Sequence, residues 1–140
     1  MAGLLTVLEI VSQAAMEIGI AQNRVSTVTT TQDQDVVQMR SLLHAVAAEV
    51  LSEEPYLSTL GDQYWIEGSD GELKSDFTAD DDLVLFDGRL AIQGTKWRFL
   101  QGKGLEFGET MRDFSSRINK LAARANARVL DLDTDWGRVQ

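Results

Sequence analysis

The sequence has no cysteine, one proline and one histidine among its 140 residues. Without cysteine there can be no disulfide, no thiol nucleophile and no thiolate ligand, so the fold must rest on its hydrophobic core. The single histidine, His44, has no second histidine or cysteine with which to form a metal site or a catalytic pair. We therefore expect His44 to be an ordinary packed or half-exposed side chain on a helix.

Long hydrophobic runs are also missing. No apolar stretch approaches the roughly 18 residues that a membrane-spanning helix needs. The first residues carry no basic side chain, so we expect no signal peptide and a mature protein that is the whole chain. Phosphate loops, dinucleotide fingerprints, nucleophile elbows and zinc signatures are absent as well. The sequence thus predicts a protein that is not an enzyme, with no catalytic residue, no cofactor, no metal and no membrane contact.

Two aspartate-rich segments are candidate cation sites. The run Asp80-Asp81-Asp82 could bind a metal, but adjacent carboxylates on a loop more often cap the element that follows. The segment from Asp131 to Asp135 resembles the first half of a calcium loop. Such a loop requires glycine at the next position, where this chain has Trp136, so the calcium interpretation fails.

The net charge of −9 is unevenly distributed along the chain. Residues 1–88 hold 3 basic and 16 acidic side chains, whereas residues 89–128 hold 9 basic and 3 acidic side chains. An acidic first part and a basic second part can attract each other between copies, which favours head-to-tail association. The alternative is a solvated basic helix face whose partners lie in the same chain.

Hydrophobic periodicity predicts one mainly α domain, an antiparallel bundle of about four helices with a short β-hairpin insertion and an extended C-terminal arm. The first helix begins at Thr6, where Thr6 and Glu9 form a capping-box pattern, and ends at Gly19. The remaining elements are a helix over about 32–53 ended by Pro55, a hairpin within 56–82, helices over about 88–102 and 106–128, and the arm over 129–140.

The helix over 106–128 has the clearest amphipathic pattern. Its apolar stripe includes Phe107, Met111, Phe114, Ile118 and Leu121. The opposite side is basic, so we expect it to contact acidic surface on a neighbouring copy. The candidate inter-subunit residues are Arg112, Arg117, Lys120, Arg124, Asp80, Asp81 and Asp82.

Four segments resemble the head–tail adaptor (neck connector) proteins of tailed bacteriophages. They are Thr6–Gly19, Gln38–Val50, the stretch from Leu83 to Arg98 with its Lys-Trp-Arg centre, and Lys103-Gly104-Leu105-Glu106-Phe107 before the last long helix. The last two are the most specific, and the match extends to about Ala127. None of these motifs is catalytic.

The resemblance implies a virion protein of the neck, made in the host bacterial cytoplasm. Its partners would be the portal protein, neighbouring copies in a dodecameric ring, tail or stopper proteins, and passing genomic DNA that is contacted without sequence specificity. It also implies that residues 1–128 form the adaptor domain and that 129–140 bind the portal. The apolar residues of that arm are Val129, Leu130, Leu132 and Trp136. Two alternatives stay open: a head-completion or tail-terminator subunit, or a small helical protein-binding domain unrelated to phage.

Overall fold

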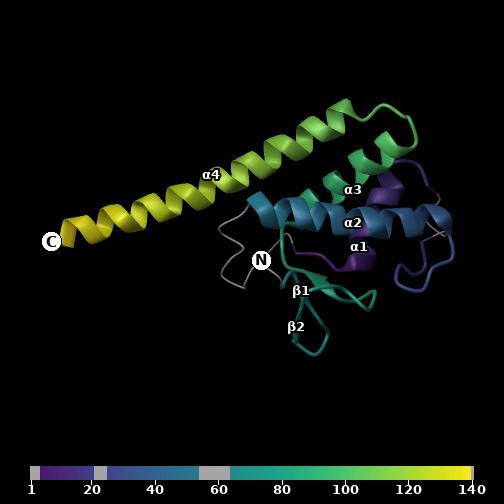
Figure 1. The fold of residues 1–140 in the computed structure, drawn as a ribbon, viewed down its shortest axis with the longest axis horizontal. Coiled ribbons are helices and arrows are strands. Elements are labelled where there is room, and N and C mark those ends of the chain that lie inside the picture. Colours follow the sequence, from purple (N-terminus) through teal and green to yellow (C-terminus); the bar gives the residue numbers. More distant parts are fainter. Residues whose placement is uncertain (1–3, 21–24, 54–63, 140) are drawn as a thin grey trace.

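The computed structural model describes residues 4–20, 25–53 and 64–139, and within these only the backbone of 52–53 and 125–139. The described part holds four helices and three short strands (Figure 1). In chain order they are α1 (Val7–Glu17), α2 (Gln34–Glu53), β1 (Ile66–Glu67), β2 (Leu73–Lys74), β3 (Leu83–Val84), α3 (Gly88–Gly102) and α4 (Gly108–Val139). The prediction of a mainly helical protein with a small β insertion is confirmed. Pro55 and the first residues of the predicted hairpin segment, 56–63, lie outside the described residues.

Helix α3 is the centre of the fold. It packs against α1, α2 and α4, and its bounds are those that the sequence predicted. Small residues on α3 allow this three-sided packing, and Gly94 shows why. A Cβ atom placed there would lie 2.8 Å from Phe114 of α4 and 2.8 Å from Val46 of α2. Such separations are well inside normal contact distance, so glycine is what lets the three helices approach each other.

The ends of α1 follow local rules. The Thr6 side chain accepts a hydrogen bond from the Glu9 backbone, and the Glu9 carboxylate accepts one from the Thr6 backbone, which confirms the predicted capping box. At the other end Gly19 has a φ of 91°, a left-handed conformation that ends the helix after Glu17 and Ile18. Helix α2 begins two residues later than predicted, where the Asp33 carboxylate accepts a hydrogen bond of 3.0 Å from the Asp35 backbone.

The predicted hairpin is present and belongs to a slightly larger sheet. The strand order is β2-β1-β3, and both pairings are antiparallel. Gly71, with a φ of 85°, permits the tight turn between β1 and β2. Strand β3 was not predicted, and it also contacts the start of the chain: Thr6 bridges Leu83, and the Val84 backbone donates to the Leu5 carbonyl at 3.0 Å. The sheet thereby joins the N-terminal segment to the middle of the sequence.

The predicted end of the last helix near Arg128 is wrong, since α4 continues to Val139. The segment 129–139 is therefore helical backbone and not an extended strand of chain. The physical reason is that the sequence after Arg128 contains no proline and only one glycine, Gly137, so nothing stops the helix. In Figure 1 the C-terminal part of α4 extends beyond the body formed by the other elements. The side chains of 125–140 lie outside the described part, so the four arm residues Val129, Leu130, Leu132 and Trp136 stay predictions.

Candidate functional site

Three of the four predicted basic contact residues lie exposed on α4. Arg112, Lys120 and Arg124 form no ion pair within the described part of the chain, and we call them the α4 basic row. Between Phe114 and Arg124 the sequence contains no acidic residue that could neutralise the last two of them. Their positive charge is therefore available to a partner.

Arg117, the fourth residue, is held within the chain. Its Nε lies 2.9 Å from Asp87 Oδ1 and its Nη2 lies 2.8 Å from Asp87 Oδ2. Asp87 also caps α3, because its Oδ1 accepts a hydrogen bond of 2.9 Å from the Leu90 backbone. Burial alone would raise the pKa of Asp87, but the hydrogen bonds from Arg117 and from the backbone lower it below its usual value. The Arg117 guanidinium thus has a structural partner, and the intramolecular alternative applies to this residue.

Asp80 serves the loop before α2. Its Oδ1 accepts hydrogen bonds from the backbone of Val28 at 3.0 Å and of Thr29 at 2.8 Å, and from the Thr29 hydroxyl at 3.0 Å. Burial would raise the pKa of Asp80, but these hydrogen bonds lower it. The carboxylate therefore joins two loops that lie far apart in sequence.

Asp82 is almost fully buried, with 1% of its surface exposed. Its Oδ2 accepts hydrogen bonds from Lys74 Nζ at 2.7 Å and from the Thr78 and Ala79 backbone at 2.7 and 3.1 Å. The sequence suggested that these aspartates cap the strand that follows. Asp82 instead accepts hydrogen bonds from the backbone of the loop before it, and Asp80 likewise binds loop backbone. Asp81, between them, is exposed. Of the three aspartates, only Asp81 presents its carboxylate mainly to solvent.

The hairpin surface carries a net negative charge. Its acidic side chains Glu67, Asp70 and Glu72, together with Asp81, are exposed or half-buried, and we call these four residues the acidic hairpin surface. Lys74 is the one basic residue between 64 and 87, and it is paired with the buried Asp82. Asp81 was predicted from the sequence as a contact residue, but Glu67, Asp70 and Glu72 were not. The signal that could have found them is their position on either side of the turn at Gly71.

Basic residues of α3 are used in ion pairs between helices. Glu17 of α1 accepts hydrogen bonds from Arg89 at 2.6 and 3.0 Å and from Lys96 at 2.8 Å. The Arg89 hydrogen bonds are the main reason that the pKa of Glu17 is lowered to about 2, against an opposing effect of burial. Arg98 pairs with Glu49 of α2 in the same way. These pairs were missed from the sequence because their members are far apart along the chain.

His44 sits in a small aromatic cluster. Its ring stacks on Phe77, with centroids 4.7 Å apart, and meets Trp65 edge-on at 6.2 Å. Its two nitrogens lie 3.0 Å from the Arg40 carbonyl and 2.7 Å from Asp76 Oδ1. Trp65 in turn donates to the Ser75 carbonyl at 2.6 Å. The contacts of His44 are those of a side chain that holds the end of the hairpin against α2.

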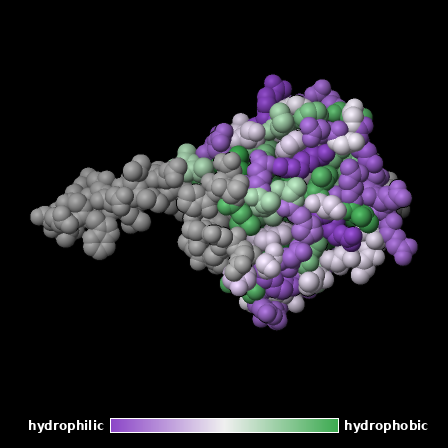
Figure 2. All heavy atoms as spheres, in the orientation of Figure 1, coloured by the Kyte–Doolittle hydropathy of each residue, from purple (hydrophilic) through white to green (hydrophobic). Residues whose placement is uncertain are grey.

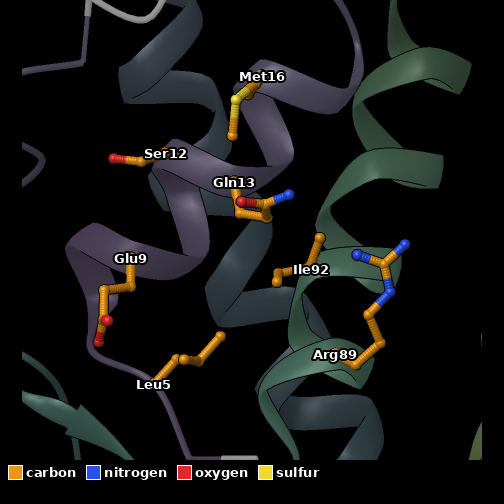
Figure 3. Close-up of a pocket in the computed structure, with 7 residues that line it drawn as sticks. All are labelled: Leu5, Glu9, Ser12, Gln13, Met16, Arg89 and Ile92. Carbon is orange, nitrogen blue, oxygen red and sulfur yellow. The ribbon is translucent and has the colours of Figure 1, made fainter.

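An open groove of about 480 Å³ lies between α1 and α3 (Figure 3). Both of its titratable side chains already have partners in the chain, Glu9 in the capping box and Arg89 in the pair with Glu17. Its lining residues are Leu5, Glu9, Ser12, Gln13, Met16, Arg89 and Ile92.

The outer surface offers no broad apolar area on the face seen in Figure 2, where hydrophobic residues form small separate patches among hydrophilic ones. Among the described residues, no three His, Asp or Glu side chains gather as a metal site. No helix in the described part is both long and apolar enough to cross a membrane. The exposed charges on α4 and on the hairpin are therefore the surface features that most suggest binding.

Comparison with protein-family profiles, with curated protein sequences and with solved structures gives no match.

Proposed function

We propose that this chain is a structural head–tail adaptor of a tailed bacteriophage, which forms a ring on the portal and joins the capsid to the tail. The proposal starts from the sequence resemblance in Thr6–Gly19, Gln38–Val50, Leu83–Arg98 and Lys103–Phe107. Its role is assembly and involves no catalysis.

The observation that most supports the proposal is the form of α4. Its 32 residues correspond to a length of about 48 Å at 1.5 Å per residue. Phe114 and Ile118, near its start, are buried against the body, while the later part extends past it (Figure 1). Helices in proteins gain most of their stability from packing an apolar face, so a helix that leaves its own domain suits a protein that docks on another. This part of α4 contains the predicted portal-binding residues.

In the proposed assembly each subunit contacts its two neighbours through different surfaces. Such a contact is heterologous, and it closes into a ring when the rotation between copies divides a full turn. The C-terminal part of α4 binds the portal, and genomic DNA passes through the central channel without sequence-specific contact. Because many subunits act together, each single contact can be weak while the ring is stable.

A portal-binding experiment tests this role. The chain and the purified portal ring of the phage that encodes it are mixed and run through size-exclusion chromatography with light scattering. We expect a complex with the mass of a portal plus a ring of this chain, and we expect it to disappear when residues 129–140 are deleted. Ser41→Ala, an exposed change on α2, is the control that should bind like wild type. Circular dichroism of the deletion variant must show that the body still melts cooperatively.

The result also separates the alternatives. Absence of binding to the portal at every salt concentration contradicts the adaptor role. Binding to a tail tube or to an already assembled neck, but not to the bare portal, favours the head-completion or tail-terminator subunit. A monomer or dimer that binds none of these particles favours the unrelated protein-binding domain.

A further inference from the structure

We propose that the acidic hairpin surface of one copy binds the α4 basic row of the next copy. The inference rests on the proposed function for the ring in which the contact recurs, but the contact itself can be tested without the portal. It replaces the broader expectation from sequence, in which Arg117, Asp80 and Asp82 also took part.

The hairpin side of the contact carries uncompensated negative charge. Asp70 and Glu72 lie at the turn and Asp81 on the loop that follows, all exposed. Lys74, which could have neutralised them, points to the buried Asp82 with a separation of 2.7 Å. An anionic surface whose one cation is used internally gains from an external cationic partner.

The helix side carries the opposite charge, and no acidic residue lies between Phe114 and Arg124 to neutralise Lys120 or Arg124. Arg112, Lys120 and Arg124 are separated by eight and four residues, which places them along one region of a helix surface. Arg117 is removed from this set by its two hydrogen bonds to Asp87. The remaining three cations can meet the three exposed acids of the hairpin and loop.

The hairpin side also has exposed apolar residues near its charges, since Leu73 is 40% exposed and Tyr64 is 39% exposed. On α4 the exposed Met111 belongs to the apolar side of the helix and lies away from Lys120 and Arg124. Charge complementarity is therefore what pairs the two surfaces.

The positions of the two surfaces favour a contact between copies. The β1–β2 hairpin points away from the body on one side, while α4 runs along the opposite side (Figure 1). They therefore do not meet within a single chain. A pair of complementary surfaces on different sides produces head-to-tail association, the type of contact that a ring requires.

Because the native chain lacks cysteine, a single introduced cysteine reports one position without interference. Full-length Leu73→Cys is mixed with full-length Ser116→Cys, an exposed position four residues from both Arg112 and Lys120 on α4. One of the two chains carries an affinity tag, and the mixture is oxidised alone at high concentration and again on the portal ring. We expect the disulfide between the two different chains to exceed either disulfide between identical chains. Met16→Cys, 47% exposed on α1, replaces Ser116→Cys as the matched control and should cross-link poorly.

Charge reversal then tests the electrostatics of the contact. Adding Lys120→Glu and Arg124→Glu to the Ser116→Cys chain should lower the yield of the mixed disulfide by about tenfold or more, because like charges then face each other. Adding Glu72→Lys and Asp81→Lys to the Leu73→Cys partner should restore it. The changed residues are exposed, so all variants should melt like the single-cysteine chains.

The possible outcomes separate this contact from the adaptor role. Cross-linking that shows the charge-reversal pattern supports the contact even if the portal is not bound, in which case only the proposed function fails. Portal binding with no excess of the mixed disulfide overturns the contact and leaves the proposed function intact. Failure of the mixed disulfide both in solution and on the portal also overturns it, as does a yield that reversing the charges does not change.

Discussion

Arg117 of α4 and Asp87 at the start of α3 form a two-point ion pair, with N···O separations of 2.9 and 2.8 Å. The same carboxylate accepts a hydrogen bond from the Leu90 backbone, so one residue both begins α3 and fixes α4 beside it. Because Asp87 makes both contacts and Arg117 only the ion pair, we expect loss of Asp87 to reduce stability more than loss of Arg117.

Asp87→Ala should lower the free energy of unfolding by about 1–2 kcal/mol, because it removes the helix cap as well as the ion pair. Arg117→Ala should cost less than about 1 kcal/mol, since the arginine is 40% exposed and its charge can be solvated. Urea denaturation of both single variants and the double variant measures their coupling. Strictly additive losses would show that the two side chains do not interact in solution.

Gly94→Ala should destabilise the protein by about 1–3 kcal/mol, because the added methyl group overlaps Phe114 and Val46. Gly102→Ala is the matched control. At that position the nearest atom to an added Cβ is Gln38 Nε2 at 3.0 Å, the end of a side chain that can turn away. Thermal unfolding should therefore show a large drop in Tm for the first variant and little change for the second. Equal drops would mean that the close approach of α2, α3 and α4 at Gly94 is not real.

The Glu17 cluster predicts a pH dependence of stability. The folded-state pKa of Glu17 is lowered from 4.5 to about 2, chiefly by its hydrogen bonds with Arg89. A lowered carboxyl pKa stabilises the fold above the unfolded-state value and loses that effect as the pH falls from about 4.5 towards 2. Glu17→Gln should thus cost on the order of 2–3 kcal/mol near neutral pH, and the difference from wild type should shrink below pH about 4.5.

Arg89→Leu provides the second half of that test. It removes the largest cause of the lowered pKa, so its denaturation curves should show a weaker pH dependence over the same interval. Urea denaturation at a series of pH values measures both variants. The stability of the wild type should depend on pH more strongly than that of Glu17→Gln. Equal pH dependence of the two proteins would contradict the proposed role of the cluster.

Asp82 and Asp81 are neighbours in the sequence, but we expect their substitution to affect stability very differently. Asp82→Ala should destabilise the protein by about 1–3 kcal/mol, because the Thr78 and Ala79 N–H groups and the Lys74 ammonium lose their shared acceptor. Asp81→Ala should leave the stability within about 0.5 kcal/mol of wild type, as expected for an exposed side chain. Hydrogen exchange of the 77–80 amides would locate the loss. If Asp81→Ala were the more damaging change, the described arrangement of the loop would be wrong.

What could be predicted from the sequence was mostly local. The capping box at Thr6 and Glu9, the end of α1 at Gly19 and the bounds of α3 depend on residues within a few positions of each other. The hairpin turn at Gly71 is local in the same sense. These features were predicted correctly because their causes lie within one turn of chain.

The features that were missed depend on distant residues. Strand β3 is only two residues long, and it exists because Ile66 and Leu5 lie on either side of Val84. The partner of Asp80 is some fifty residues away, at Val28 and Thr29, and that of Arg117 is Asp87, thirty residues before it. No local pattern in the sequence distinguishes these carboxylates from solvated ones, so the set of residues free to bind a partner could not be chosen before the fold was known.

Among the described side chains of α4, those buried against the body are Phe114 and Ile118, near its start, and the helix can act as a lever about them. Beyond Leu121 it continues for about 27 Å to Val139, at 1.5 Å per residue. A change in the angle of α4 of about 10° at Phe114 and Ile118 would therefore move the far end by roughly 5 Å. A core substitution that changes this angle therefore moves the tip of the helix without altering any residue at the tip.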